Sequence, residues 1–373
     1  MTAVGVPGGI STSGICTDCR VPGRAWSGSM RRLPLWFSIM VLSLSVASAE
    51  TETPSLVDVF KRVNPAVVEI HTLETYLVSK GTPVRVTGLG SGVLISRDGR
   101  VLTAAHVVQT ADAIEVEFLT GEKVPARVVS SEPEVDLAYL QLETMPRMAY
   151  VASLADSDRV EVGASVFVIG APLGVSHTLT VGHISGHHNL DAVGGIAGGD
   201  LFQTDTAINE GNSGGPMFNM EGEVIGIVSR ILSLSGGSDG LGFVITSNVA
   251  RRFLEEKSFW SGLGSQVLSG DLARVFNVPP PGIGLLVQKV ASGSPAELAG
   301  LKAGTIQARV GDDELIVGGD IVLSIMGIPV DRPDYMAAIR EKAAAALPGQ
   351  KVEVVVLRGG RILTLTSIVP GRQ

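Results

Sequence analysis

Short runs of apolar residues, separated by glycine-rich and polar turns, dominate the chain from residue 66 onward. Runs of this kind predict β-strands, which we expect at residues 66–70, 88–96, 114–118, 123–129, 166–170, 201–205 and 224–228. Asp98-Gly99 is typical of a hairpin turn between two such strands. Because helical patterns do not separate these runs, the chain is predicted to be mostly β, with antiparallel barrels rather than a doubly wound sheet.

Two stretches without a strand pattern are predicted to be connections. One includes Tyr76 to Thr82, and the other is the glycine-rich segment 182–200 just before the serine motif described below. Long connections within compact domains are often functional or mobile.

The pattern of predicted elements changes after residue 257, where helices alternate with strands. Strands are expected at 284–290, 320–325, 352–357 and 361–368, and helices at 295–300 and 333–346. Further helices are expected at 55–62 and 248–257. We therefore predict one domain over residues 50–257 and a smaller α+β domain over residues 258–373.

Residues 1–49 are typical of a leader with a secretory signal peptide. Met30-Arg31-Arg32 precedes a short apolar stretch that closes with Ala47-Ser48-Ala49. We expect cleavage after Ala49 and interpret Met30 as the true start. The alternative is an uncleaved anchor, which alone would associate the chain with a membrane. Cys16 and Cys19, the two cysteines of the chain, precede this segment, so the mature chain is expected to contain no disulfide.

Charge excludes one class of partner. With residues 1–49 removed, 25 basic and 36 acidic residues remain, which is a net charge of −11. An acidic balance argues against binding to nucleic acid.

The most informative motif is Gly211-Asn212-Ser213-Gly214-Gly215-Pro216. Glycines beside a serine permit close approach of a substrate and unusual backbone angles. Successive N–H groups of Gly211, Asn212 and Ser213 are candidates for an oxyanion hole.

A serine nucleophile needs a base and a residue that orients the base, and the chain offers both. His106 follows the apolar run Leu102-Thr103-Ala104-Ala105, and Asp136 opens another apolar run. The order His106, Asp136, Ser213 is that of chymotrypsin-type proteases. Asp205 is the competing candidate for the orienting carboxylate, although its place near the serine suits a structural hydrogen bond better.

These motifs resemble the HtrA (Deg) family of serine proteases, and the segment Ser292 to Gly304 resembles the PDZ domain of that family. The resemblance covers about residues 55–370. It implies two six-stranded chymotrypsin-like β-barrels followed by one PDZ domain, and a serine endopeptidase acting in the periplasm on unfolded or damaged proteins. It also implies a homotrimer, or a multiple of trimers, that binds C-terminal peptides.

The resemblance also implies positions for peptide binding. The carboxylate loop of the PDZ domain would fall at Ile283, Gly284, Leu285 and Leu286, with a peptide adding a strand beside Leu285 to Val287 and facing the helix around Tyr335 to Ile339. In the protease domain, Ile208 and Arg230 would border the substrate pocket.

Several residues depart from the family pattern. Glu210 replaces the usual proline before Gly211, Arg230 replaces a small residue, and Thr305 with the insertion 306–318 alters the PDZ segment. Glu210 and Arg230 motivate an alternative function, a holding chaperone or peptide-sensing adaptor with little turnover. The segment 182–200 corresponds to the family loop that relays PDZ contacts to the oxyanion site.

No cofactor and no metal site is predicted. His183, His187 and His188 superficially resemble a metal cluster, but they lie in a glycine-rich segment without paired carboxylates, so solvated loop residues are the preferred interpretation.

Overall fold

The computed structural model describes residues 54–369 except 79–81, 148, 190–199, 232–238, 257–258, 312, 333 and 348. The predicted leader, its cleavage site after Ala49 and the predicted domain boundary at Ser258 lie outside the described residues. No helix in the described part of the chain is both long and apolar enough to cross a bilayer.

A capped helix precedes the first barrel. Helix α1 (Leu56–Val63) begins after Ser55, whose side chain accepts a hydrogen bond of 3.3 Å from the backbone N–H of Asp58. Val59 and Val63 lie on one face of the helix and are fully buried in the core. A 3-10 turn, η1 (Asn64–Ala66), then leads into the first strand.

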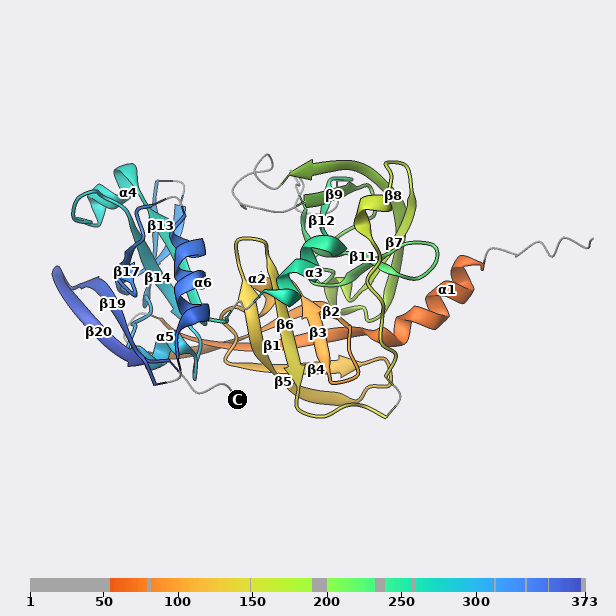
Figure 1. Cartoon of the computed structure of the whole chain (residues 1–373), viewed down its shortest axis with the longest axis horizontal. Coiled ribbons are helices and arrows are strands. Elements are labelled where there is room, and N and C mark those ends of the chain that lie inside the picture. The colour runs from red at the N-terminus through yellow and green to blue at the C-terminus, as the bar shows by residue number, and fades with distance from the viewer. Residues whose placement is uncertain are drawn as a thin grey trace, which may run out of the picture. The chain divides into compact units, whose positions relative to one another are not determined.

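The first barrel closes in the strand order β1-β2-β3-β6-β5-β4 (Figure 1). Every pairing in it is antiparallel. Its elements are β1 (Val67–Val78), β2 (Thr82–Leu94), β3 (Arg100–Thr103), α2 (Ala105–Val108), β4 (Ala113–Phe118), β5 (Lys123–Glu132) and β6 (Leu137–Leu142).

The second barrel closes in the order β10-β11-β12-β9-β8-β7 and is followed by a helix. Its elements are η2 (Ser157–Arg159), β7 (Ser165–Gly170), η3 (Pro172–Gly174), β8 (Thr178–Asn189), β9 (Asp200–Thr204), β10 (Pro216–Phe218), β11 (Val224–Ile231), β12 (Gly242–Thr246) and α3 (Ser247–Glu255). The two closed six-stranded barrels confirm the predicted fold class.

The C-terminal domain contains a sheet of order β13-β14-β17-β19-β20, with β18 paired to β17. Its elements are β13 (Leu263–Leu268), α4 (Gly270–Val275), β14 (Gly284–Val290), α5 (Pro295–Leu298), β15 (Ile306–Val310), β16 (Asp313–Val317), β17 (Ile321–Ile325), β18 (Ile328–Pro329), α6 (Tyr335–Ala345), β19 (Lys351–Arg358) and β20 (Arg361–Ile368). The insertion 306–318 forms the separate β15–β16 hairpin, in which Ile306 pairs with Val317.

Two predicted connections are wrong in part. The segment that includes Tyr76 continues β1 as far as Val78, and β2 already begins at Thr82. Residues 182–189 belong to β8, which pairs with both β7 and β9. Only 190–199 of the predicted second connection fall between strands, and these lie outside the described residues.

Candidate active site

The imidazole of His106 is held by Asp136. His106 lies on α2 directly after β3, and its Nδ1 is 2.9 Å from both Oδ1 and Oδ2 of Asp136. The backbone N–H of His106 also donates to Asp136 Oδ1 at 3.0 Å. The carboxylate therefore fixes both the ring and the main chain that carries it.

Asp136 occupies an unusual backbone position just before β6. Its φ is +56°, a left-handed conformation that non-glycine residues seldom adopt. Its side chain is 11% exposed, and Oδ2 also accepts a short hydrogen bond from Ser229 Oγ. Sequence reasoning did not identify Ser229, although it stands directly before Arg230.

Burial and the neighbouring Asp136 shift the pKa of His106 in opposite directions. Burial is the largest single influence and lowers its pKa, whereas the hydrogen bond and the charge of Asp136 raise it, and together they leave the pKa above its ordinary value. The positive charge of Arg230 opposes Asp136 and lowers the pKa.

Ser213 lies in the connection between β9 and β10. Its Oγ donates a long hydrogen bond of 3.4 Å to the carbonyl oxygen of Ser229. No hydrogen bond joins Ser213 to His106 within the described residues. The structure thus pairs His106 with Asp136 and places His106 and Ser213 in the lining of one cavity, with the Ser213 hydroxyl directed to the β11 main chain.

The glycines on either side of Asn212 and Ser213 are sterically required. Gly211 has φ +98°, and a Cβ there would lie 2.1 Å from the carbonyl oxygen of Ala171. Gly214 has φ +81°, and a Cβ there would lie 2.1 Å from Thr103 Oγ1. Any larger residue at either position would displace the loop that carries the serine.

The predicted oxyanion hole is corrected at one residue. The backbone N–H of Asn212 donates to the carbonyl oxygen of Asn209 at 3.0 Å, so it is not free to bind an oxyanion. The N–H groups of Gly211 and Ser213 have no hydrogen-bond partner in the part of the chain that the structure describes. These two groups remain the candidates for the hole.

Ser91 on β2 ties the serine loop to the first barrel, and sequence reasoning missed it. Its Oγ donates to the carbonyl oxygen of Gly211 at 2.7 Å and accepts from the N–H of Ala171 at 3.1 Å. Its own N–H donates to the carbonyl oxygen of Ser213 at 2.8 Å. The only signal in the sequence is its place in Gly90-Ser91-Gly92.

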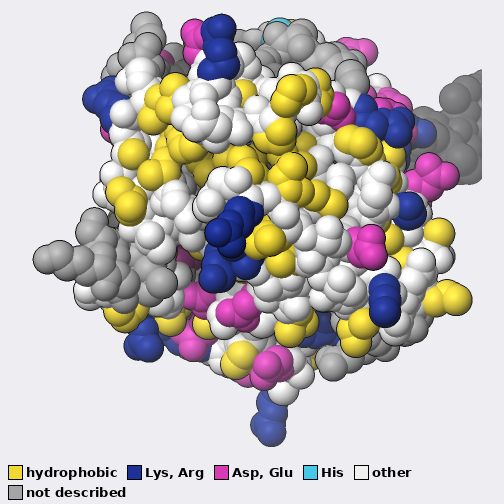
Figure 2. All heavy atoms as spheres, turned by 90° about the vertical axis from the view of Figure 1, so that its left-hand side faces the viewer, with side chains coloured by type: hydrophobic (Ala, Val, Ile, Leu, Met, Phe, Trp, Pro, Cys, Tyr) yellow, Lys and Arg dark blue, Asp and Glu magenta, His cyan; other side chains and the backbone are white. Residues whose placement is uncertain are grey.

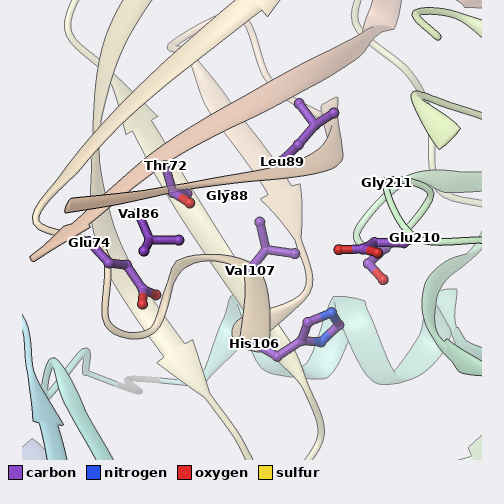
Figure 3. Close-up of a pocket in the computed structure, with 10 residues that line it drawn as sticks. Thr72, Glu74, Val86, Gly88, Leu89, His106, Val107, Glu210 and Gly211 are labelled. Atoms are coloured by element: carbon purple, nitrogen blue, oxygen red, sulfur yellow. The ribbon is translucent and has the colours of Figure 1, made fainter. Parts of the chain in front are cut away.

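His106 and Ser213 open onto a cavity of about 240 Å³. In the view of Figure 3, Glu74 lies at one end and Glu210 at the other, with His106 and Val107 between them. The charged side chains that line this cavity are therefore acidic. Its lining residues are Thr72, Glu74, Val86, Gly88, Leu89, His106, Val107, Glu210, Gly211 and Ser213.

The two predicted pocket residues do not line this cavity. Ile208 is 2% exposed and packs in the core of the second barrel. Arg230 on β11 is half-buried, and its Nη2 is buried without a hydrogen-bond partner. The charge of Arg230 nevertheless acts on His106, as described above.

His183, His187 and His188, which the sequence analysis interpreted as loop residues and not as a metal site, have separate partners in the structure. His183 pairs with Asp205 at 3.6 Å, His187 packs edge-on against Phe202, and His188 Nε2 lies 2.8 Å from Gln203 Oε1.

The predicted peptide site on the C-terminal domain is wrong. Gly284 to Val290 form β14, which pairs with β13 on one side and, at Leu285 and Leu286, with β17 on the other. A peptide therefore finds no free strand edge beside Leu285 to Val287, and Ile283 to Leu286 do not form the predicted loop and edge. The outer strand on this side of the sheet is β13.

Two closed six-stranded barrels, with a histidine–aspartate pair from one and a glycine-flanked serine from the other, define a chymotrypsin-like serine protease fold. Residues 90–227 match the trypsin-like peptidase domain, and residues 252–369 match the PDZ domain.

The sequence is 34% identical over 336 residues to the periplasmic pH-dependent serine endoprotease DegQ of Escherichia coli (strain K12), covering 83% of this chain and 69% of that protein. The structure is similar to that of the HtrA-type protease AlgW with a tripeptide, with a TM-score of 0.50, 32% identity, and coverage of 86% of this chain and 98% of that one. The chain belongs to the HtrA (Deg) family of serine endoproteases.

Proposed function

We propose that this serine endopeptidase acts in the periplasm on unfolded or damaged envelope polypeptides through an acyl-enzyme intermediate. The observation that carries the proposal is one cavity that joins Ser213, the Asp136-held imidazole of His106 and the free N–H of Gly211. The secretion signal predicted before Ala49 and the periplasmic relative support the location. Assembly as a homotrimer, or a multiple of trimers, belongs to the same proposal.

In this mechanism each group has a distinct role. Ser213 Oγ attacks the peptide carbonyl carbon, and His106 Nε2 takes its proton while Asp136 holds Nδ1–H and stabilises the imidazolium. The N–H groups of Gly211 and Ser213 donate to the developing oxyanion. His106 then returns the proton to the leaving amine, and water releases the acyl group by the same route in reverse. Ser213 must first turn from Ser229 O toward His106.

A fluorophosphonate probe tests this assignment directly. Ser213 Oγ is expected to displace fluoride and form the phosphonate ester, whereas serines outside the cavity that contains His106 should remain unlabelled. Labelling is read by mass spectrometry of the peptide that contains Ser213, with urea-unfolded protein as the control. Equal labelling of folded and unfolded protein would refute the assignment.

Peptide regulation is proposed at the outer edge of β13, in place of the β14 site rejected above. An extended peptide can add a strand to an exposed sheet edge. Hydrophobic side chains gather on the face shown in Figure 2, and Val267 of β13 is 47% exposed. Gln109, three residues after His106, donates its Nε2–H to the carbonyl oxygen of Leu263 at 3.1 Å. The rate of Ser213 labelling is therefore expected to change with a C-terminal peptide, and an unchanged rate would exclude this regulation.

A holding chaperone or peptide-sensing adaptor with low turnover remains the second candidate. The observation that favours it is the resting arrangement, in which Ser213 Oγ donates to Ser229 O. This function predicts that folded protein suppresses aggregation of an unfolded client while Ser213 stays unlabelled, with or without peptide. Rapid labelling of the resting protein would exclude it.

Arg230→Gln is expected to shift the pH profile of peptide hydrolysis. The general base must be neutral, so activity rises with pH through the pKa of His106. Because the charge of Arg230 lowers this pKa, its removal should raise the pKa and move the acidic limb of kcat/KM to higher pH. Arg252→Gln, which removes an exposed arginine of α3, should leave the limb unchanged. A limb that moves to lower pH in the Arg230 variant would contradict the electrostatic role.

A further inference from the structure

Strands β1 and β4 bring three metal-ligating side chains together away from the catalytic residues. Glu69 and Glu117 are register partners on the two antiparallel strands, and His71 lies two residues along β1 on the same face as Glu69. His71 Nε2 is 3.0 Å from Glu117 Oε2 and 3.8 Å from Glu69 Oε2. One ligand atom from each residue lies within 4.8 Å of the others. We call Glu69, His71 and Glu117 the β1–β4 cluster.

Glu69 carries a buried negative charge that a bound cation would stabilise. Its side chain is 10% exposed, and its carboxylate accepts no hydrogen bond from any described residue. Its neighbours among the described residues are the imidazole of His71 at 3.8 Å and, across the strand pair, the carboxylate of Glu117. Like charges directly opposite each other in a sheet are destabilising, and burying a carboxylate without hydrogen bonds is costly.

The ammonium group of Lys123 does not compensate the charge of Glu69. Lys123 Nζ lies 3.1 Å from Glu115 Oε1 and 3.3 Å from Glu117 Oε2, so it serves the outer carboxylates of β4. No ion pair joins Lys123 to Glu69 among the described residues. The buried end of the cluster therefore remains undercompensated in charge.

A second histidine, His177, lies close enough to the cluster for the charges of Glu69 and Glu117 to act on its ring. His177 Nδ1 is 2.8 Å from Asn64 Oδ1, and because that amide oxygen can only accept, the ring proton lies on Nδ1 and Nε2 keeps its lone pair. A histidine whose second nitrogen is fixed by a side-chain oxygen is the usual arrangement of a metal ligand.

We propose that Glu69, His71 and Glu117 bind one Zn²⁺ ion, with His177 as the candidate for the fourth position. Mixed imidazole and carboxylate ligands suit zinc, whereas Ca²⁺ and Mg²⁺ require oxygen ligands alone. Ligands about 2.0–2.2 Å from a tetrahedral zinc are about 3.3–3.6 Å from each other. The observed separations of 3.0 and 3.8 Å require only small side-chain movements to reach that range.

The site is open to solvent and adjoins the wall of the catalytic cavity. His71 and Glu117 are 36% and 28% exposed, so an ion can reach them. The next residue of β1 after His71 is Thr72, which pairs with Gly88 and lines the cavity. Zinc would therefore fasten β1 to β4 beside this wall and stabilise the first barrel as any ligand of the native state does. The proposal concerns binding and does not depend on the catalytic assignment.

Zinc binding is tested by titration of the metal-stripped chain, followed by calorimetry. Cys16 and Cys19 are first replaced by serine, because thiolates of the leader would also bind zinc. We expect one ion per chain, an increase in Tm with zinc, and a Co²⁺ absorption spectrum of a tetrahedral nitrogen and oxygen site. Glu69→Gln and His71→Asn, each checked for native circular dichroism, should weaken binding by about tenfold or more.

Three further variants separate a site from general surface charge. Glu115→Gln removes the carboxylate that stands opposite His71 across the strand pair and contacts Lys123, and His183→Asn removes an exposed histidine that pairs with Asp205. Both should leave the affinity within about threefold, because neither supplies a ligand. Lys123→Gln removes the ammonium that competes for Glu117 and should tighten binding. Absence of binding at micromolar zinc, or equal affinity in the Glu69 and His71 variants, would overturn the proposal.

Discussion

Ser213→Ala is expected to lower kcat for hydrolysis of an unfolded protein by about 10⁶-fold, because it removes the hydroxyl that is proposed to form the acyl bond. His106, Asp136 and the free N–H groups remain in place, so a residual rate about 10³–10⁴ above that of water is expected from the oxyanion hole and binding. Casein hydrolysis by the two proteins at equal concentration, followed over days for the variant, measures the ratio.

The folded state should tolerate this substitution. Ser213 Oγ makes a single long hydrogen bond of 3.4 Å, so its removal should change the free energy of unfolding by less than about 1 kcal/mol. Ser176→Ala removes an exposed serine of the second barrel and serves as the matched control with full activity. A Ser213→Ala protein that keeps more than about one hundredth of the activity would reject Ser213 as the nucleophile.

The strands of the barrels could be predicted from the sequence where at least one face of the strand is buried. They could not be predicted where both faces are exposed. The last five residues of β2 are buried, and the sequence placed that strand correctly. The preceding residues of β2 are exposed or half-exposed, so they carry no alternating pattern, and the partner stretch around Tyr76 was predicted as a connection. Strand pairing beyond the core is decided by register with a neighbour, which a single segment does not reveal.

A similar limit explains why the sequence prediction placed the proposed peptide site beside β14 and not at β13. Leu263 to Leu268 alternate between polar and apolar residues only weakly, and half of them are half-buried, so the sequence pattern predicted no strand there. The more apolar β14 was chosen instead, although its apolar character reflects burial between β13 and β17. In sheets generally, the most hydrophobic strand is usually central, so high hydrophobicity argues against a free edge.

The candidate triad His106, Asp136 and Ser213 could be recognised in the sequence because each of its members lies in a distinctive local motif. Ser91 and Ser229 could not, because a serine hydroxyl that bonds a main-chain carbonyl or a distant carboxylate has no local signature. The β1–β4 cluster could not be predicted from the sequence either, since Glu117 lies opposite Glu69 only because of the antiparallel register of β1 and β4. Chemistry that depends on tertiary pairing needs the structure.

Asp136→Asn is expected to lower kcat by about 10⁴-fold. The amide is nearly the same size as the carboxylate, but its NH₂ group can donate to Nδ1 of His106, which stabilises the tautomer that carries its proton on Nε2 and cannot accept from Ser213. Peptide hydrolysis at saturating substrate measures the loss. Because Asp136 accepts from both His106 and Ser229, thermal unfolding of the variant must accompany the kinetics.

The pH profile of this variant distinguishes a catalytic carboxylate from a merely structural one. In the native protein the hydrogen bond and charge of Asp136 outweigh burial and keep the pKa of His106 raised. Without that charge, burial and Arg230 both lower the pKa, so the acidic limb of the residual activity should move to lower pH. Asp205→Asn is the matched control, since Asp205 accepts from the backbone N–H of His183 at 2.5 Å and is the competing orienting residue. A large loss in the Asp205 variant with little in the Asp136 variant would transfer the role to Asp205, whereas a retained limb in a folded Asp136 variant would show that the carboxylate does not act through His106.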